Sequence, residues 1–325
     1  MNDTHDETDD FNDWPAYQPP ASSGRTTAPV SPAPVLQKSV QQKASTAIPF
    51  PFSNKPDHFP GIFSRSSLFG AIRSTKSPEP VVPMDIKAQG NYSIVLDGHR
   101  LSMFDKAVFE SVIRIAKASS HNLEEQLECS LSEIALHLGW EARGGRDLQC
   151  IFDSLARVAA TSIEYRLLDG VMRKGRLLGS VEKGRTGISL GFDAGLILAT
   201  FGIDKQFKFD RNRRALLDGA LAQWLHDFIS THTTNQPMPL IHYLGLSGYV
   251  ARSKSFPEKL GTALAEIKTK APELVAGIVW NKPTKSSERW MVEIVKGSEK
   301  ASFIDPAKKH TAPAKPASTR SGVAL

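Results

Sequence analysis

Two stretches of the sequence hold residue types that could perform phosphate binding or catalysis. The first, residues 179–186, reads Gly-Ser-Val-Glu-Lys-Gly-Arg-Thr and has the glycine spacing of a phosphate-binding P-loop. A P-loop needs Lys where Arg185 stands, and it needs a following helix whose N-terminus holds the phosphate. Residues 188–192 instead have the pattern of a strand. We therefore predict a basic hairpin here and no nucleotide site.

The second stretch contains His226, Asp227, Ser230 and His232, which could form a catalytic or metal-binding group. Two histidines six residues apart on a helix point about 240° apart, because each residue turns the helix by about 100°. They cannot share one ion, so we expect both histidines to cap or pack the helix. The chain also lacks a His-apolar-His pair, which argues against a nickase built on that metal motif. We predict no enzyme activity, no metal site and no cofactor.

The charge of the chain favours a polyanionic partner. The 325 residues carry a formal net charge of +6, yet the first fourteen residues hold six acidic residues and no Lys or Arg. The rest of the chain is therefore near +12, counted from the same sequence. A basic body of this kind favours nucleic acid as a partner, although it says nothing about the fold.

Cysteine content and hydropathy indicate a protein of a reducing compartment. Cys129 and Cys150 are the only cysteines, too few for a disulfide framework or a four-thiol zinc site. The N-terminus is acidic and lacks the apolar core of a signal peptide. No run approaches the ~20 apolar residues that span a bilayer. We expect a cytoplasmic protein, associated with nucleoid or plasmid DNA, and no membrane partner.

The two ends of the chain have the composition of disordered segments. Residues 1–57 are rich in Pro, Ser, Ala, Thr and Gln, and residues 297–325 in Lys, Ala, Pro, Ser and Thr. Such segments cannot bury enough apolar surface to offset their ordering entropy. We predict a disordered acidic, Pro-rich arm and a disordered basic tail. The acidic start could mimic DNA or could aid solubility.

Residues 58–90 are unusually apolar for a linker. They are either a strap packed on the folded body, which we favour, or a short linear motif for a partner. Ser67, Leu68 and Phe69 match the end of the peptide that binds bacterial sliding clamps, although Arg65 stands where that peptide has Gln.

Residues 91–205 predict a first folded unit. A strand at 92–96 and a turn at 97–98 precede an amphipathic helix at 104–116. A capping pair, Ser130 and Glu133, opens a short helix that Gly139 ends, and a third helix follows the turn from Trp140 to Gly145. Strand patterns then occupy 162–166, 176–182 and 188–192. Helix, helix-turn-helix and hairpin is the order of a winged helix-turn-helix domain.

The polar positions of this unit supply its DNA-binding candidates. The outer face of the third helix, with the turn before it, would approach base edges in the major groove. The hairpins would meet backbone phosphates as a wing. The candidates are Arg143, Arg146, Gln149 and Arg157 on the helix side, and Arg166, Arg173, Lys174, Arg176, Lys183 and Arg185 on the wing.

Residues 206–296 repeat this order by pattern and not by identity. Apolar residues from Leu216 to Phe228 predict one long buried helix, with Arg214 and Asp227 on its wet side. A short helix at 240–246 and a helix opened by a capping box of Ser255 and Glu258 follow. Strands at 275–280 and 289–295 form a second wing. The DNA-binding candidates are Arg252, Lys254, Lys259, Thr262, Lys285 and Arg289. The predicted fold is α+β, with tandem winged helix-turn-helix domains between disordered tails.

Residues 224–233, Trp-Leu-His-Asp-Phe-Ile-Ser-Thr-His-Thr, resemble the TrfA family of plasmid replication initiators. Three more stretches carry the resemblance, which covers roughly residues 60–270. They are residues 65–69, Gly139-Trp140 with Gly145-Arg146-Asp147 and Leu155, and Phe256 with Leu260, Ala263 and Leu264.

The resemblance implies an initiator that binds repeated sites, called iterons, at a plasmid origin and that sets copy number. It implies melting of adjacent AT-rich DNA and recruitment of the host initiator, replicative helicase and sliding clamp, with a monomer–dimer equilibrium. In this reading the outer helices of both units contact DNA. The alternative is a winged-helix transcriptional regulator. A third possibility is an interaction protein that binds no DNA and whose basic faces are only solvated.

Overall fold

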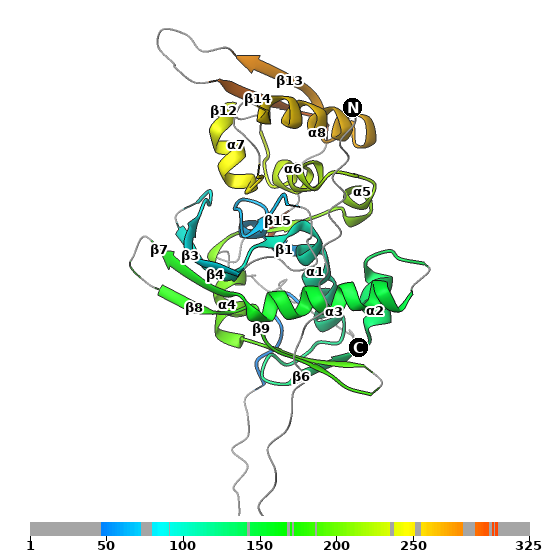
Figure 1. Cartoon of the computed structure of the whole chain (residues 1–325). Helices are drawn as coiled ribbons and strands as arrows, with labels where there is room; N and C mark the ends of the chain where they lie inside the picture. The colour runs from blue at the N-terminus through cyan, green and yellow to red at the C-terminus, as the bar shows by residue number, and fades with distance from the viewer. Residues whose placement is uncertain are drawn as a thin grey trace, which may run out of the picture. The chain divides into compact units, whose positions relative to one another are not determined.

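The computed structural model shows helices and small, mostly antiparallel sheets along one chain (Figure 1). This arrangement confirms the mixed helix-and-sheet class. The residues that the structure describes are 47–72, 80–90, 92–141, 144–167, 170, 172–185, 187–234, 237–250, 255–281, 290–298, 301 and 303–304.

The first unit contains a helix, a pair of helices joined by a turn, and a three-stranded antiparallel sheet. The strands lie in the order β6-β10-β9, so the last strand of the unit is central. Figure 1 shows α3 lying alongside β9. The elements, in chain order, are α1 (Met103–Ala118), β6 (Gln126–Cys129), α2 (Leu131–His137), α3 (Gly145–Ala160), β9 (Leu178–Lys183) and β10 (Ile188–Phe192).

The second unit has the same order of elements and the same sheet topology. Its strands lie in the order β12-β14-β13, so again the last strand is central between the first and second. The elements are α6 (Ala220–Ser230), β12 (Pro237–Pro239), α7 (Leu240–Ser247), α8 (Phe256–Lys270), β13 (Val275–Asn281) and β14 (Met291–Lys296). The predicted internal repeat of pattern is thus present in the structure as a repeat of topology.

A separate four-stranded sheet belongs to the first unit alone. Its order is β3-β4-β7-β8, formed by β3 (Pro80–Ile86), β4 (Tyr92–His99), β7 (Ser162–Leu167) and β8 (Met172–Arg176). The sequence predicted one wing from 162 to 192; the structure divides this stretch into two hairpins in different sheets. The expected turn at 97–98 is also wrong, because β4 continues through it. Gly98 has φ +129°, and a Cβ there would lie 2.9 Å from the carbonyl oxygen of Ala160.

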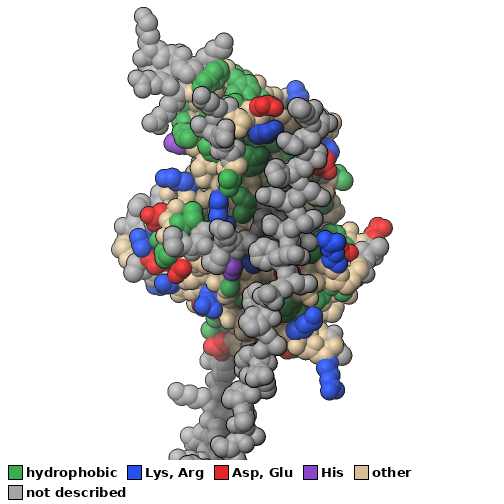
Figure 2. Space-filling view, in the orientation of Figure 1, with side chains coloured by type: hydrophobic (Ala, Val, Ile, Leu, Met, Phe, Trp, Pro, Cys, Tyr) green, Lys and Arg blue, Asp and Glu red, His purple; other side chains and the backbone are tan. Residues whose placement is uncertain are grey.

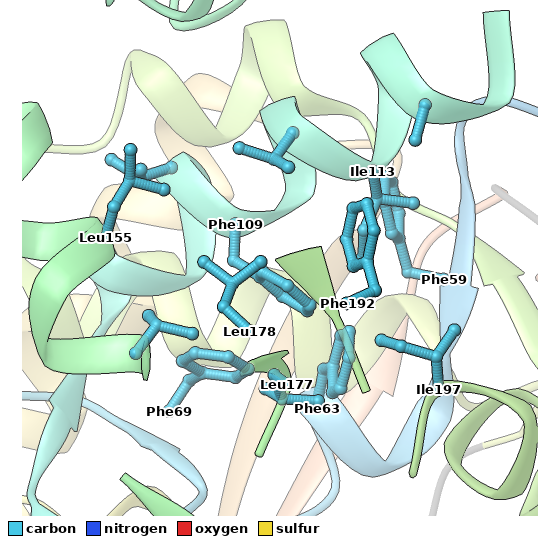
Figure 3. Packing of buried hydrophobic residues seen from close by; sticks show 14 of the residues in the cluster. Phe59, Phe63, Phe69, Phe109, Ile113, Leu155, Leu177, Leu178, Phe192 and Ile197 are labelled. Atoms are coloured by element: carbon cyan, nitrogen blue, oxygen red, sulfur yellow. The ribbon is translucent and has the colours of Figure 1, made fainter. Parts of the chain in front are cut away.

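Residues 58–72 are a strap embedded in the core of the first unit. The strap contains β1 (His58–Pro60), a 3-10 turn η1 (Gly61–Phe63) and β2 (Phe69–Gly70). Within the strap, the rings of Phe63 and Phe69 meet edge-on at 5.3 Å between centroids, and both pack on Phe109 of α1, Phe63 edge-on at 6.0 Å and Phe69 stacked at 6.4 Å (Figure 3). Leu68 and Phe69 have no exposed surface, and Ser67 lies beside Lys87. The favoured reading of a packed strap is therefore confirmed, and the alternative of an accessible clamp-binding motif at Ser67, Leu68 and Phe69 does not fit the burial of Leu68 and Phe69.

Folded structure begins earlier and ends later than the composition indicated. Phe50 is 2% exposed and packs against Phe192 and Phe201, so residues 47–57 are not part of a disordered arm. β15 (Phe303–Ile304) pairs with β11 (Gln206–Lys208), whose other side pairs with β1. The remaining predicted disorder, residues 1–46 and 305–325, lies outside the described residues.

The predicted long helix of the second unit is two helices. α5 (Arg211–Ala215) is capped by Asp210, whose carboxylate accepts from the backbone N–H of Arg213. Residues 216–219 then break the helix, and α6 starts after Gly219. The Glu266 carboxylate fixes the break, because it accepts a 2.7 Å hydrogen bond from the backbone N–H of Asp218. Leu216, predicted in the buried stripe, is 59% exposed.

Several elements were not predicted, among them one helix and a number of short strands. α4 (Ala194–Ile203) starts at Asp193, whose side chain accepts from the backbone N–H of Leu196. Its apolar residues lie at nearly every position, so no helical stripe marks it in the sequence. The short β5 (Leu101–Ser102) pairs in parallel with β2.

α1 is buried on all sides and is not amphipathic as predicted. Four of its charged side chains, Lys106, Glu110, Arg114 and Lys117, have at most 5% of their surface exposed. Lys117 donates to the carbonyl oxygens of His58 at 2.7 Å and Lys55 at 3.2 Å, and its amine lies over the rings of Phe59 and Phe201. Burial, with a contribution from Arg114, lowers the pKa of Lys117 to about 7.

The Lys117→Met variant should have a weaker dependence of stability on pH than the parent. In the folded parent, Lys117 loses its proton above about pH 7, because its pKa is lowered. In the unfolded chain, the same lysine keeps its proton up to about pH 10. The unfolding free energy of the parent therefore rises with pH in this window, by at most about 1.4 kcal/mol per pH unit. Urea unfolding at pH 6.5, 8 and 9.5 measures the difference. The exposed Lys268→Met is the control and should keep the parent's slope.

Candidate nucleic-acid interface

The N-terminal half of α3 is exposed and ordered by its own cap. The Asp147 carboxylate accepts a 3.0 Å hydrogen bond from the backbone N–H of Gly144, while Ile151 and Leu155 anchor the helix in the core. Arg146 and Gln149 lie on the exposed face. Gln149 donates to Asp153 at 2.7 Å, one turn along the helix. Arg146 is thus the cation that this face presents, and Arg143 lies outside the described residues.

The prediction that Arg157 lies on the outer, DNA-facing side of α3 is wrong. It is 8% exposed, and its guanidinium donates two hydrogen bonds to Asp105 Oδ1 at 2.7 and 3.1 Å. Asp105 also accepts from Ser154 and from the backbone N–H of Ser102, where it completes the capping box of α1. Arg157 therefore joins α3 to the start of α1.

The exposed cations of the first unit lie mainly on its two hairpins. On β7 and β8, Arg166, Arg173 and Lys174 are exposed, and Arg166 donates to Glu164 at 2.6 Å. On the hairpin of β9 and β10, Lys183 lies 5.4 Å from the Phe152 ring of α3, and Arg185 is exposed at the turn. On the face drawn in Figure 2, Lys and Arg side chains are spread over the surface with Asp and Glu among them.

The second unit presents Lys259 and Thr262 on the outer face of α8. Both are exposed, although the Thr262 hydroxyl donates to the carbonyl oxygen of Glu258 at 2.9 Å. The predicted capping box of Ser255 and Glu258 does not form, because Ser255 has helical backbone angles and its side chain makes no capping hydrogen bond. Four candidates lie outside the described residues: Arg252, Lys254, Lys285 and Arg289.

A buried ionic cluster, formed by Lys106, Glu110, Arg214 and Asp227, joins the two units. Asp227 Oδ2 accepts from Lys106 Nζ at 2.7 Å and from Arg214, and Arg214 also donates to Glu110. Arg214 and Asp227 were predicted to face solvent, but they are 4% and 0% exposed. Burial alone would raise the pKa of Asp227; the charges of Arg214 and Lys106 outweigh it and hold that pKa well below its usual range.

Two of the stretches that carry the resemblance to plasmid initiators, residues 65–69 and 224–233, contact each other. Arg65 of the strap donates to the Thr231 hydroxyl at 3.0 Å and to its carbonyl oxygen at 2.6 Å. The Trp224 indole N–H points at the carbonyl oxygen of Ser66 at 3.4 Å, and Arg65 also lies 4.0 Å from Asp204. These residues therefore dock the strap on α6 and do not form a DNA surface.

The two histidines considered for catalysis have structural roles, as predicted. His226 is buried, with Nδ1 3.0 Å from Asp227 Oδ1. His232 Nδ1 lies 2.8 Å from the carbonyl oxygen of Phe228, and burial lowers its pKa to about 4. Within the described residues, no group of three or more His, Cys, Asp or Glu could hold a metal ion. No helix in that part of the chain is long and apolar enough to cross a membrane.

Two solved structures of domains 2 and 3 of RctB are similar to the chain. One, of selenomethionine derivatives of the domains, has a TM-score of 0.47 at 12% identity and covers 76% of this chain and 99% of that chain. The other, of residues 155–483 of RctB, has a TM-score of 0.40 at 12% identity and covers 72% of this chain and 96% of that chain. Both TM-scores lie below 0.5, so neither similarity identifies the function of this chain. No family model and no curated protein sequence matches it.

The Asp227→Asn variant should be about 3–5 kcal/mol less stable than the parent, because it leaves Arg214 and Lys106 buried without their shared carboxylate. The matched control is Asp218→Asn. Asp218 accepts from Lys270 at 3.0 Å, but its side chain is 92% exposed, so this variant should lie within about 0.5 kcal/mol of the parent. Urea unfolding measures both. Equal stabilities for the two variants would show that the buried cluster contributes nothing specific.

Proposed function

We propose that this chain is a non-catalytic DNA-binding protein that initiates plasmid replication. Each folded unit would be a winged helix-turn-helix that binds one part of a repeated origin site. Binding would promote opening of the adjacent DNA and recruitment of host replication proteins. The observation that carries the proposal is the repeated topology of the two units.

In both units a helix, a strand, two helices and a hairpin occur in this order, with β7 and β8 inserted before the hairpin of the first unit, and the last strand is central in the sheet. The second helix of each helix-turn-helix is α3 or α8, and both present polar residues outward from an anchored apolar side. A helix held in this way fits the major groove, where base edges can be distinguished. Two such units in one chain fit a site that spans more than one groove.

The exposed cations support backbone contact more than base contact. Arg166, Lys174 and Arg185 extend from hairpins, where a neighbouring phosphate would be met, whereas Arg146 is the exposed arginine on the described part of α3. Phosphate contacts position a protein on the duplex, and base contacts specify the sequence. We therefore assign Arg146 to sequence recognition and the hairpin residues to affinity. Lys259 and Thr262 have the corresponding place on α8.

The proposal of an initiator, and not only a DNA-binding protein, is supported by the resemblance to the TrfA family. Two of the stretches that carry the resemblance, residues 65–69 and 224–233, join the strap to α6, so the resemblance extends beyond a single helix-turn-helix. The test is a plasmid with a minimal candidate origin, supplied with this protein in trans. Replication that depends on the protein is expected. Sequence-specific binding without replication would instead make the protein a transcriptional regulator.

The affinity for the specific site should fall steeply with salt. If about 6–10 phosphates are neutralised, the association constant should fall about 10³–10⁵-fold between 50 and 200 mM salt. Fluorescence anisotropy with a labelled duplex at four salt concentrations measures this slope. Affinity that is independent of salt would contradict phosphate contact by the hairpins.

Arg146→Gln and Arg185→Gln should affect binding differently. The first should lose about 1–3 kcal/mol on the specific site and little on random DNA, if the guanidinium contacts a guanine edge. The second should weaken binding to both DNAs alike and reduce the salt slope by about one. Competition binding with specific and random duplexes separates the two. Equal losses on both duplexes for Arg146→Gln would refute a reading role for Arg146.

A further inference from the structure

A hydrogen bond between two side chains orders the exposed face of α3. Nε2 of Gln149 lies 2.7 Å from Oδ1 of Asp153, one helical turn further along. Arg146, Gln149 and Asp153 lie on one side of the helix, because each residue turns the helix by about 100°. Arg146 and Gln149 are exposed, and Asp153 is half-buried, nearer to the anchored end of α3.

Asp153 is an acidic residue on the side of α3 that the proposed function turns toward DNA, where a carboxylate repels phosphates. The other acidic residue in this half of the helix, Asp147, caps the first turn through the backbone N–H of Gly144. Asp153 lies too far along α3 to cap it, and within the described residues it forms no ion pair. The interaction that the structure gives this carboxylate is its hydrogen bond with Gln149.

The Asp153 carboxylate fixes which groups the Gln149 side chain presents. A carboxylate accepts hydrogen bonds, so the Gln149 amide must turn its NH₂ group, and not its oxygen, toward Asp153. One of the two N–H groups is then used. The amide presents outward one N–H donor and one carbonyl acceptor, side by side, and within the described residues neither makes another hydrogen bond.

We propose that Gln149 recognises an adenine base and that Asp153 is the positioning residue that selects adenine against guanine. In the major groove, adenine presents one acceptor, N7, beside one donor, the N6 amino group, whereas guanine presents two acceptors, N7 and O6. A glutamine with both N–H groups available can donate to the two guanine acceptors. Gln149 held by Asp153 matches adenine instead. The inference rests on the proposed DNA-binding function and adds to it one base and one residue.

The place of the adenine within the site follows from the helix. Residues three apart on a helix have Cβ atoms about 5–6 Å apart, and stacked bases are separated by about 3.4 Å. The adenine should therefore lie one or two base pairs from the base that Arg146 contacts. The N-terminal residues of a recognition helix contact base edges, which fits base contact by Gln149 and a supporting position for Asp153.

Selection of binding sites from a pool of random duplexes tests the proposal with the full chain. The parent should select a site that contains an adenine preferred over guanine by about 5–100-fold, and Gln149→Ala should lose this preference. Asp153→Ala should lower the same adenine-to-guanine ratio about 2–10-fold, because a freed amide can rotate and donate both N–H groups. The preferences at the other base pairs should not change.

Two controls separate positioning from charge. Asp153→Ala also removes a negative charge from the DNA-facing side, which should raise the affinity for every sequence. Glu182→Ala removes an exposed negative charge from β9 and should raise affinity in the same way, without changing the adenine preference. In a Gln149→Ala background, Asp153→Ala should have no further effect on base preference, because Asp153 acts through Gln149.

The outcomes distinguish this inference from the proposed function. A parent that selects no sequence would overturn the proposed function and the inference with it. A selected site without an adenine that depends on Gln149 would overturn the inference alone. So would an unchanged adenine-to-guanine ratio in Asp153→Ala, since a Gln–Asp pair that only stabilises the helix lowers stability and leaves base preference as it was.

A measurement without DNA checks the hydrogen bond itself. The NMR resonances of the Gln149 side-chain amide should shift in Asp153→Ala and stay in place in Glu182→Ala. Equal spectra for Asp153→Ala and the parent would overturn the positioning role. If Asp153→Ala does not fold by circular dichroism, Asp153→Leu, which keeps the shape of the side chain without its acceptors, takes its place in both experiments.

Discussion

The structure depends on the buried carboxylate of Asp227, which is shared by Lys106 of the first unit and Arg214 before α6. Removing such charges from water costs several kcal/mol each, and only close opposite charges offset that cost. Because the partners lie on α1, α5 and α6, the cost is offset only when the two units are assembled. The same assembly seats the strap, since Ser64 accepts from Lys106 at 2.7 Å. The ionic cluster therefore specifies one arrangement of the units more than it adds stability.

Local patterns in the sequence were sufficient to predict the two helices that follow the first strand of each unit. Apolar spacing predicted α2, α3, α7 and α8, and Ser130 caps α2 as expected. Periodicity failed where a helix is buried on every side. The periodicity predicted that Arg214 and Asp227 are exposed to solvent. A charged residue outside the apolar stripe gives the same sequence pattern whether its side chain contacts water or a buried opposite charge. A Lys and a Glu four residues apart within an apolar helix, as at Lys106 and Glu110, were the available indication.

Long-range pairing was beyond the reach of these patterns. The apolar composition of the strap predicted that it packs on the folded body. No pattern in the neighbouring sequence identified α6 as the helix that it contacts. The hairpins gave strand patterns without their sheet partners, so one wing was predicted where the structure has two hairpins. The candidate DNA surface in the structure therefore differs from the predicted one. Arg157 lies in the core, and most of the exposed cations lie on the hairpins. Part of the resemblance, at Arg65, Trp224 and Thr231, falls on residues that hold the strap to α6, and another part falls on Arg146, a proposed DNA contact.

The position of the strap in the chain has a consequence for synthesis on the ribosome. Arg65 is made 166 residues before its partner Thr231, and Ser66 158 residues before Trp224. At about 5–20 residues per second, translation takes about 8–33 s to add the intervening segment. Throughout that time Arg65 of the strap lacks Thr231, and Lys106 of α1 lacks Asp227. The first unit thus emerges with an incomplete interior, and a nascent chain stalled before α6 would be a natural substrate for chaperones.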